Sequence, residues 1–356
     1  LSVMSVLCGV MISLCGGLRA QPAIPAALEL VPAGQDYYLR IDLHAMTQTA
    51  NGDKILGAVA QSQPGFPHEM LFNEFDSAMS GRWARNFPGQ IRIIEAFGLY
   101  PPGDNVMLGM EEDEASAYLG SYDTQRMVAD MQAAGFQKSE PYRGQTIMVS
   151  PMNDEYLAMT NTFTLLHATT RPRLEQMIDV AKGESIPAND PQNPQAGLLS
   201  GATGAYFYMM ARLPEAARKQ ISSAVANPDA QFYEIIPGVM EVTRELPSID
   251  LVALSAREAH GSLRVDVAMQ MLSEESAKRL VDGFGTVFPM IVSEVRNQAN
   301  KMMPFDQKTG AEMDKAATAL ENVTWRREGK TVSLFIPVPP SAIDQMVMQA
   351  SMMGGF

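Results

Sequence analysis

Two runs in the second half of the chain alternate apolar and polar residues with a period of two. They are SIDLVALSARE at 248–258 and GSLRVDVAMQM at 261–271, separated by a short break. A period of two predicts β-strands that bury one face, and two such strands in close succession predict a hairpin. A hairpin with one apolar face must be covered by a helix or by another sheet, so this pair constrains the fold more than any other segment.

The segment after this hairpin carries apolar residues at helical spacing. Ser273 stands where an N-cap is favoured, so a long amphipathic helix is predicted to begin after it. Pro289 lies inside that helix and is expected to kink it or to divide it in two. Beyond it, the pattern predicts a polar helix at 309–320, a hairpin that turns near Glu328 and Gly329, and a final helix at 339–352.

The first half of the chain mixes strands and helices in the same way. Strands are predicted at 36–44, 115–122, 143–151 and 155–170, with helices after Asp123, after Thr170 and at 88–98. Short turns join several of the strands, and helices are interspersed among them. This order predicts an α+β fold with largely antiparallel sheets and packed helices, because a doubly wound parallel sheet would alternate strand and helix throughout.

A short pattern recurs in the two halves of the chain. YRGQTIMVSP at 142–151 is echoed by REGKTVSLFIP at 327–337, each with a glycine, a polar residue, a threonine and an apolar run. Glycine favours a turn that needs relaxed φ, and the residues after it enter a strand. The echo therefore indicates architecture and not a site, and two related halves would explain it. We expect a first half at 21–235 and a second at 236–356.

The N-terminal segment has the composition of an export signal. Residues 1–18 are apolar apart from small residues, and LRA at 18–20 precedes a Pro/Ala-rich stretch. This predicts a signal peptide at 1–20 and a periplasmic or extracellular protein. A retained membrane anchor is the alternative, although Gly and Ser make the segment marginal as a span. A lipid anchor through Cys15 is less favoured because Leu14, and not a small residue, precedes it.

Charge narrows the classes of partner. The chain carries a formal net charge of −13, which repels a polyanion, so nucleic acid is not an expected partner. Both cysteines, Cys8 and Cys15, lie within the predicted signal peptide. A mature chain would therefore have no disulfide and no cysteine-based metal site.

The segments YRGQTIMVSP, EYLAMTNTFTLLHATTRPRLEQMIDVAKG, GAYFYMM and LVALSARE resemble a loose group of exported bacterial proteins of unknown function. In that group a Y-x-G strand is followed by a hairpin, a helix and an aromatic, apolar strand. The likeness spans about 118–211 and, more faintly, 248–338. It implies an envelope location and an α+β fold, and it has no catalytic residues to transfer.

The usual catalytic and cofactor motifs are missing from the sequence. The four histidines, His44, His68, His167 and His260, are isolated, and no serine elbow or nucleotide-binding glycine loop occurs. The acidic run at 111–114 lacks the spacing of a calcium loop, so a solvated turn is expected there. We therefore predict no catalytic residues, no metal site and no cofactor. A hydrolase with a dispersed active site remains the alternative, since such sites are defined by geometry.

Methionine is the unusual component, with 26 residues in the chain. Thioethers can bind Cu(I), but they also fill adaptable apolar surfaces, and the second use is favoured here. The predicted contact is a Met- and Phe-lined groove for a lipid or peptide, with these residues as candidates: Met269, Met271, Phe284, Phe288 and Met346.

A second candidate contact is GRWARNF at 81–87, where Arg82, Trp83 and Arg85 combine cations with an aromatic ring in an acidic chain. The expected function is non-catalytic binding of a hydrophobic ligand, a peptide or an envelope partner. A structural or assembly role stays open beside the hydrolase, and so does the oligomeric state.

Overall fold

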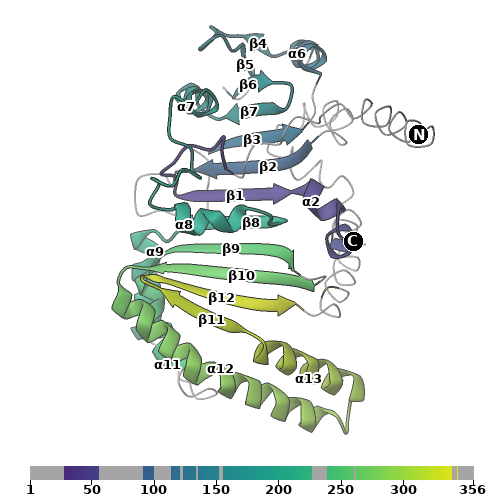
Figure 1. The fold of residues 1–356 in the computed structure, drawn as a ribbon, viewed down its shortest axis with the longest axis vertical. Coiled ribbons are helices and arrows are strands. Elements are labelled where there is room, and N and C mark those ends of the chain that lie inside the picture. The colour runs from purple at the N-terminus through teal and green to yellow at the C-terminus, as the bar shows by residue number, and fades with distance from the viewer. Residues whose placement is uncertain are drawn as a thin grey trace, which may run out of the picture.

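The computed structural model describes residues 28–55, 91–99, 114–120, 123–133, 135–151, 155–226, 239–259, 262–338 and 343. These residues form a twelve-stranded sheet that runs the length of the molecule, in the order β11-β12-β10-β9-β8-β1-β2-β3-β7-β6-β5-β4 (Figure 1). Every strand pair among them is antiparallel. The predicted α+β class is therefore confirmed.

The strands that precede residue 213 occupy one part of the sheet. They are β1 (Tyr37–Asp42), β2 (Ile91–Gly98), β3 (Glu114–Gly120), β4 (Gln137–Lys138), β5 (Ile147–Val149), β6 (Tyr156–Asn161), β7 (Thr164–Ala168) and β8 (Phe207–Arg212). The remaining strands are β9 (Ile249–Ala259), β10 (Ser262–Met271), β11 (Thr324–Glu328) and β12 (Thr331–Val338). Strand β8 pairs directly with β9, so one continuous sheet crosses the predicted boundary between 235 and 236.

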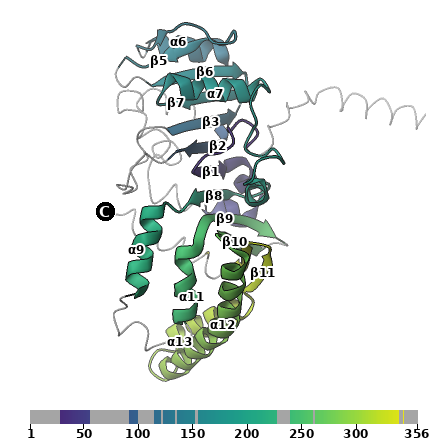
Figure 2. The ribbon, with the colours of Figure 1, turned by 90° about the vertical axis from the view of Figure 1, so that its left-hand side faces the viewer.

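Helices lie on both faces of the sheet. They are α2 (Leu43–Thr47), α6 (Thr124–Ala133), α7 (Arg171–Ala181), α8 (Ala196–Leu199), α9 (Glu215–Ala226), α11 (Val239–Glu245), α12 (Glu274–Met302) and α13 (Gln307–Glu321). Helices α7 and α8 contribute to one apolar cluster, and Figure 2 shows α9 and α11 side by side in the edge-on view of the sheet. No helix in the described residues is long and apolar enough to cross a membrane.

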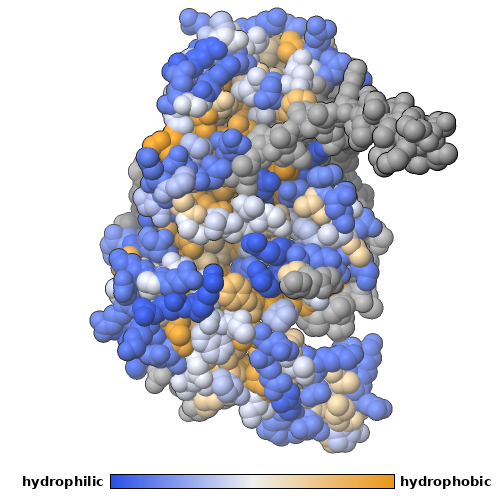
Figure 3. Space-filling model, viewed as in Figure 1, coloured by the Kyte–Doolittle hydropathy of each residue, from blue (hydrophilic) through white to orange (hydrophobic). Residues whose placement is uncertain are grey.

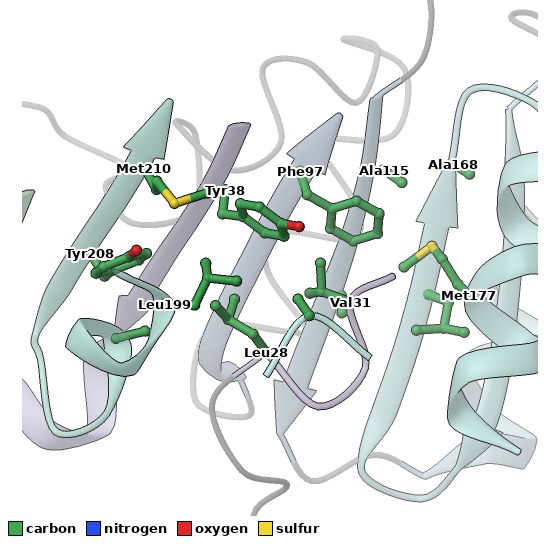
Figure 4. Close-up of a cluster of buried hydrophobic side chains, with 14 of the residues drawn as sticks. Leu28, Val31, Tyr38, Phe97, Ala115, Ala168, Met177, Leu199, Tyr208 and Met210 are labelled. Carbon is green, nitrogen blue, oxygen red and sulfur yellow. The ribbon is translucent and has the colours of Figure 1, made fainter. Parts of the chain in front are cut away.

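The largest apolar core lies between the middle strands and the helices α7 and α8. Tyr38, Phe97 and Tyr208 point from neighbouring strands toward Leu28 and Leu199 (Figure 4). The side chains of Tyr38 and Phe97 are fully buried, so this cluster excludes water from the centre of the sheet.

An ion pair is buried in the same part of the sheet. Arg40 on β1 bonds Glu95 on β2, and the backbone N–H of Leu28 donates to Glu95 at 2.8 Å. Burial raises the pKa of Glu95, while the charge of Arg40 opposes that rise. Removing either partner would leave an uncompensated buried charge, which is strongly destabilising.

The helix predicted at 88–98 is wrong, because Ile91–Gly98 forms strand β2. Ile93 and Glu95 face one side of the sheet and Ile94 the other, and all three are buried. A strand covered on both faces reads as a continuous apolar run, which periodicity cannot distinguish from a helix. Pro289 was expected to kink or divide the long helix, and α12 continues from Glu274 to Met302 without a division.

The echoed glycines both lie in turns. Arg143 and Gly144, with φ of 46° and 76°, connect the paired residues Tyr142 and Gln145. Gly329, with φ of 56°, begins the two-residue connection between β11 and β12. Positive φ costs glycine little, so the echo is architectural as expected. Two related halves remain a prediction.

Candidate functional site

A groove opens where α12, α13 and β11 meet. Its cavity measures about 670 Å³ and is lined by these residues: Phe288, Pro289, Val292, Ser293, Arg296, Asn297, Asn300, Leu320, Glu321, Val323 and Trp325. Helices α12 and α13 extend together beyond β11 at one end of the sheet (Figure 1). The groove therefore lies between the last strand of the sheet and a helical hairpin.

Local sequence signals fix the two helices of this hairpin. The Ser273 side chain accepts from the backbone N–H of Ser276 and caps α12, as predicted. Asp306 caps α13 by accepting from the N–H of Thr309 at 3.1 Å. Gly310 allows close approach of the helices, since a Cβ there would lie 2.8 Å from the side chain of Met303 and 2.9 Å from its backbone nitrogen.

Three aromatic rings form the floor behind the groove. The rings of Phe288 and Trp325 are stacked with centroids 5.1 Å apart, and Phe284 meets Phe288 edge-on at 5.7 Å. Phe284 is buried, whereas Phe288 and Trp325 are half-buried and line the cavity. Aromatic pairs at these separations stabilise each other beyond simple burial. The floor is thus a preformed, partly exposed apolar surface.

Polar groups form the rim. Arg296 donates to Glu321 at 2.7 Å and lies 3.5 Å from Asp314, so α12 and α13 are joined across the groove. The hydrogen bond with Arg296 lowers the pKa of Glu321, and the same bond raises the pKa of Arg296. Asn297 and Asn300 are exposed on α12 and offer amide donors and acceptors.

The predicted ligand-binding residues fall into separate places. Met269, Met271 and Phe284 are buried in one apolar cluster, at 8%, 1% and 9% exposure, beneath α12. Only Phe288 among the described candidates lines the groove. Met346 lies outside the described residues, and so do Arg82, Trp83 and Arg85 of the predicted partner contact. Ligand binding by any of them stays a prediction.

Trp325 is the groove residue that sequence reasoning missed. It lies on β11 between Thr324 and Arg326, whose side chains point to the opposite face of the sheet. The alternation of an indole with polar neighbours was the available signal. Its partner, Phe288, is close to it only because α12 folds back over the sheet.

The described residues hold no group of three or more His, Cys, Asp or Glu side chains placed to bind a metal ion. His167 is buried on β7 with its Nε2 atom 3.8 Å from Glu155. Neither residue lines the groove. The groove offers apolar contact and hydrogen bonding.

No protein-family model and no curated protein matches the chain. Among solved structures, crystal forms I, III and IV of TP0453, a Treponema protein, are similar at 8–10% identity. They cover 92–93% of this chain and 97–100% of their own, with TM-scores of 0.41–0.42. A TM-score at this level is too low to support an inference about this chain.

Proposed function

We propose that this protein is an exported, non-catalytic binding protein that holds a peptide segment of an envelope partner in the groove between α12, α13 and β11. The observation that carries the proposal is the stacked pair of Phe288 and Trp325 at the floor of a cavity of about 670 Å³. Cavities of several hundred Å³ with an apolar floor and a few polar groups are typical ligand sites.

The rim favours a peptide over an acyl chain. Ser293, Asn297 and Asn300 are exposed along one wall and present hydroxyl and amide groups to the groove. A peptide backbone supplies donors and acceptors for these groups, whereas a hydrocarbon chain would leave them without partners. Arg296 and Glu321 already satisfy each other, so the groove does not demand a charged ligand.

Export is the part of the proposal that rests on sequence. The apolar segment at 1–18, followed by LRA, supports a signal peptide, although it lies outside the described residues. Separation of the periplasmic, membrane and cytoplasmic fractions of producing cells, with N-terminal sequencing of the product, tests it. Cleavage after Ala20 is the expected result, and a cytoplasmic product with an intact N-terminus would contradict it.

The groove is tested with Trp325 as its own reporter. The chain has two tryptophans, so Trp83→Phe leaves Trp325 as the single indole. Peptides selected from a phage-displayed library of random dodecamers are synthesised and titrated against this variant. We expect the emission of Trp325 to shift on binding, because the peptide covers a half-buried ring. A dansylated fatty acid serves as the competing probe.

Two matched substitutions on α12 locate the binding. Ser293→Phe fills the groove and is expected to weaken peptide binding about tenfold or more, or about 1.4 kcal/mol. Gln298→Phe adds the same ring at an exposed α12 position that does not line the groove, and it should leave affinity unchanged. Equal effects of the two substitutions, or binding of the dansylated acid in place of any peptide, would contradict the peptide proposal.

A further inference from the structure

The face of the sheet opposite α12 carries an arginine-rich surface, which we define by Arg257 on β9, Arg264 and Asp266 on β10, Arg326 on β11 and Phe335 on β12. Strand registry places these side chains on one face. Arg264 pairs with Arg257, and Asp266 pairs with Phe335. Phe335 also pairs with Thr324, which lies on the same face of β11 as Arg326. Hydrophilic residues gather over this part of the molecule in Figure 3. The arginine-rich surface stands out in a chain of net charge −13.

Like charges face each other across two of these strands. Arg257 and Arg264 are direct cross-strand neighbours, an arrangement that is destabilising unless a counter-charge intervenes. Asp266 supplies one counter-charge to both: its carboxylate lies 3.4 Å from Nε of Arg257 and 2.7 Å from Nε of Arg264. One carboxylate therefore serves two guanidinium groups.

Arg326 adds a third cation at the edge of the sheet. Its ion pair with Glu328 spans 3.4 Å, and both side chains are well exposed, at 62% and 71%. A pair this exposed contributes little and is easily replaced by another anion. Three guanidinium groups thus meet two carboxylates, those of Asp266 and Glu328, which leaves this face with one net positive charge.

Phe335 holds two of the cations without neutralising them. The guanidinium carbons of Arg264 and Arg326 each lie 5.3 Å from the centre of its ring. A cation over an aromatic face is stabilised by the ring, and its N–H edge remains free to donate. Nη2 of Arg264 donates to Asp266 at 2.9 Å, whereas its Nε lies 2.7 Å from the same carboxylate without a hydrogen bond.

Arg257 is held differently and fixes one side of the surface. It donates to the carbonyl of Gly201 at 2.6 Å, to that of Thr203 at 3.3 Å and to the hydroxyl of Ser255 at 3.2 Å. Its charge remains although its Nη1 and Nη2 atoms already donate to these oxygens. It therefore adds positive potential to the surface without needing to contact a ligand.

Two cavities border the ring of Phe335. Cavities of about 420 and 530 Å³ are each lined by Arg264, Arg326 and Phe335. Oxyanions such as phosphate accept two parallel N–H bonds from a guanidinium group, and a phosphomonoester carries a charge near −2 at neutral pH. We propose that this surface binds the phosphomonoester group of a ligand, with Arg264 and Arg326 as its donors. The proposal does not depend on the groove, which lies on the opposite face of the sheet.

Isothermal titration calorimetry at low ionic strength tests the proposal with inorganic phosphate and glycerol 3-phosphate as soluble probes. Vesicles of phosphatidylcholine with and without phosphatidic acid test whether the group is a lipid headgroup. We expect binding of a phosphomonoester with a Kd of about 1 mM or lower. Binding restricted to phosphatidic acid vesicles would assign the group to a lipid, and binding of glycerol 3-phosphate to a soluble ligand.

Adjacent arginines on β11 provide the matched control. Arg326→Gln is expected to weaken phosphate binding at least tenfold, whereas Arg327→Gln makes the same charge change on the opposite face and should alter affinity less than about twofold. Phe335→Leu should also weaken binding, because the two guanidinium groups lose the ring that orients them. Equal losses from Arg326→Gln and Arg327→Gln, or no binding of any phosphate probe, would overturn the proposal.

Discussion

The two faces of strands β9–β12 are built from alternate residues of the same segments, and they differ in burial and in polarity. On one face, Val332 and Leu334 are buried against α12. On the other, Phe335 belongs to the arginine-rich surface and Ser333 lines one of the cavities beside it. The covered face stabilises the fold by excluding water, while the other keeps charge accessible. One short strand therefore contributes to the apolar core with one set of residues and to a charged surface with the other.

The largest expected difference is in stability, between substitutions of two neighbouring residues of β12. Leu334→Ala should lower the free energy of unfolding by about 2–4 kcal/mol, because it leaves a cavity beneath α12. Phe335→Ala should cost about 1 kcal/mol, because it removes cation–π contacts at a half-exposed site. Urea denaturation monitored by circular dichroism measures both. An equal cost would show that the second face also belongs to the stabilising core.

The second effect concerns the hairpin that extends the covered face. Gly310→Ala should cost about 1–3 kcal/mol, because the added carbon meets the backbone of Met303 and forces α13 away from α12. Gly285→Ala on α12 meets no atom within 4 Å and should stabilise by about 0.5–1 kcal/mol through helix propensity. Thermal denaturation of the two variants gives the comparison. A neutral Gly310→Ala would mean that the two helices are not closely packed in solution.

The smallest effect is a pH dependence of the same hairpin. Hydrogen bonds with Arg296 and with Thr309 lower the pKa of Glu321 and Asp306, respectively. A carboxyl whose folded pKa is depressed stabilises the protein above its unfolded pKa, near 4, and loses that contribution as the pH falls through the folded value. The effect should be small because both groups are exposed.

The difference in urea midpoint between wild type and Glu321→Gln measures this contribution. It should be present at pH 6 and shrink as the pH approaches 3, since protonated Glu321 no longer binds Arg296 as an anion. Glu312 is an exposed residue of α13 with no ion pair to another described residue, so Glu312→Gln is the control and should show a difference close to zero at both pH values. A difference that persists unchanged at pH 3 would contradict the assignment.

Several elements were predictable from the sequence because their signals are local. The β9–β10 hairpin and the Ser273 cap of α12 follow from alternation and from capping chemistry. The error at β2 has a physical cause: Glu95 is buried beside Arg40, and a strand covered on both faces shows no alternation. No local sequence pattern predicts which segments will cover the two faces of β2.

The candidate site also contains residues that local sequence predicts and residues that it does not. Phe288 was predicted as a contact residue from its place on an apolar helix, and it does line the groove. Trp325 was not, because its role depends on stacking with a residue 37 positions earlier in the chain. The arginines of the opposite face alternate with apolar residues, as on any half-buried strand, so the sequence does not indicate that two of them meet at Phe335.

By itself the sequence determined the α+β class, the positions of most of the described strands and those of the helices α6, α7, α12 and α13, since periodicity, caps and turn glycines act over a few residues. Only the tertiary structure decided that all the strands join one sheet, that Trp325 meets Phe288, and that Arg264 and Arg326 flank one ring. Strand order and helix placement are set by long-range packing, and a site made from distant segments exists only after that packing is complete.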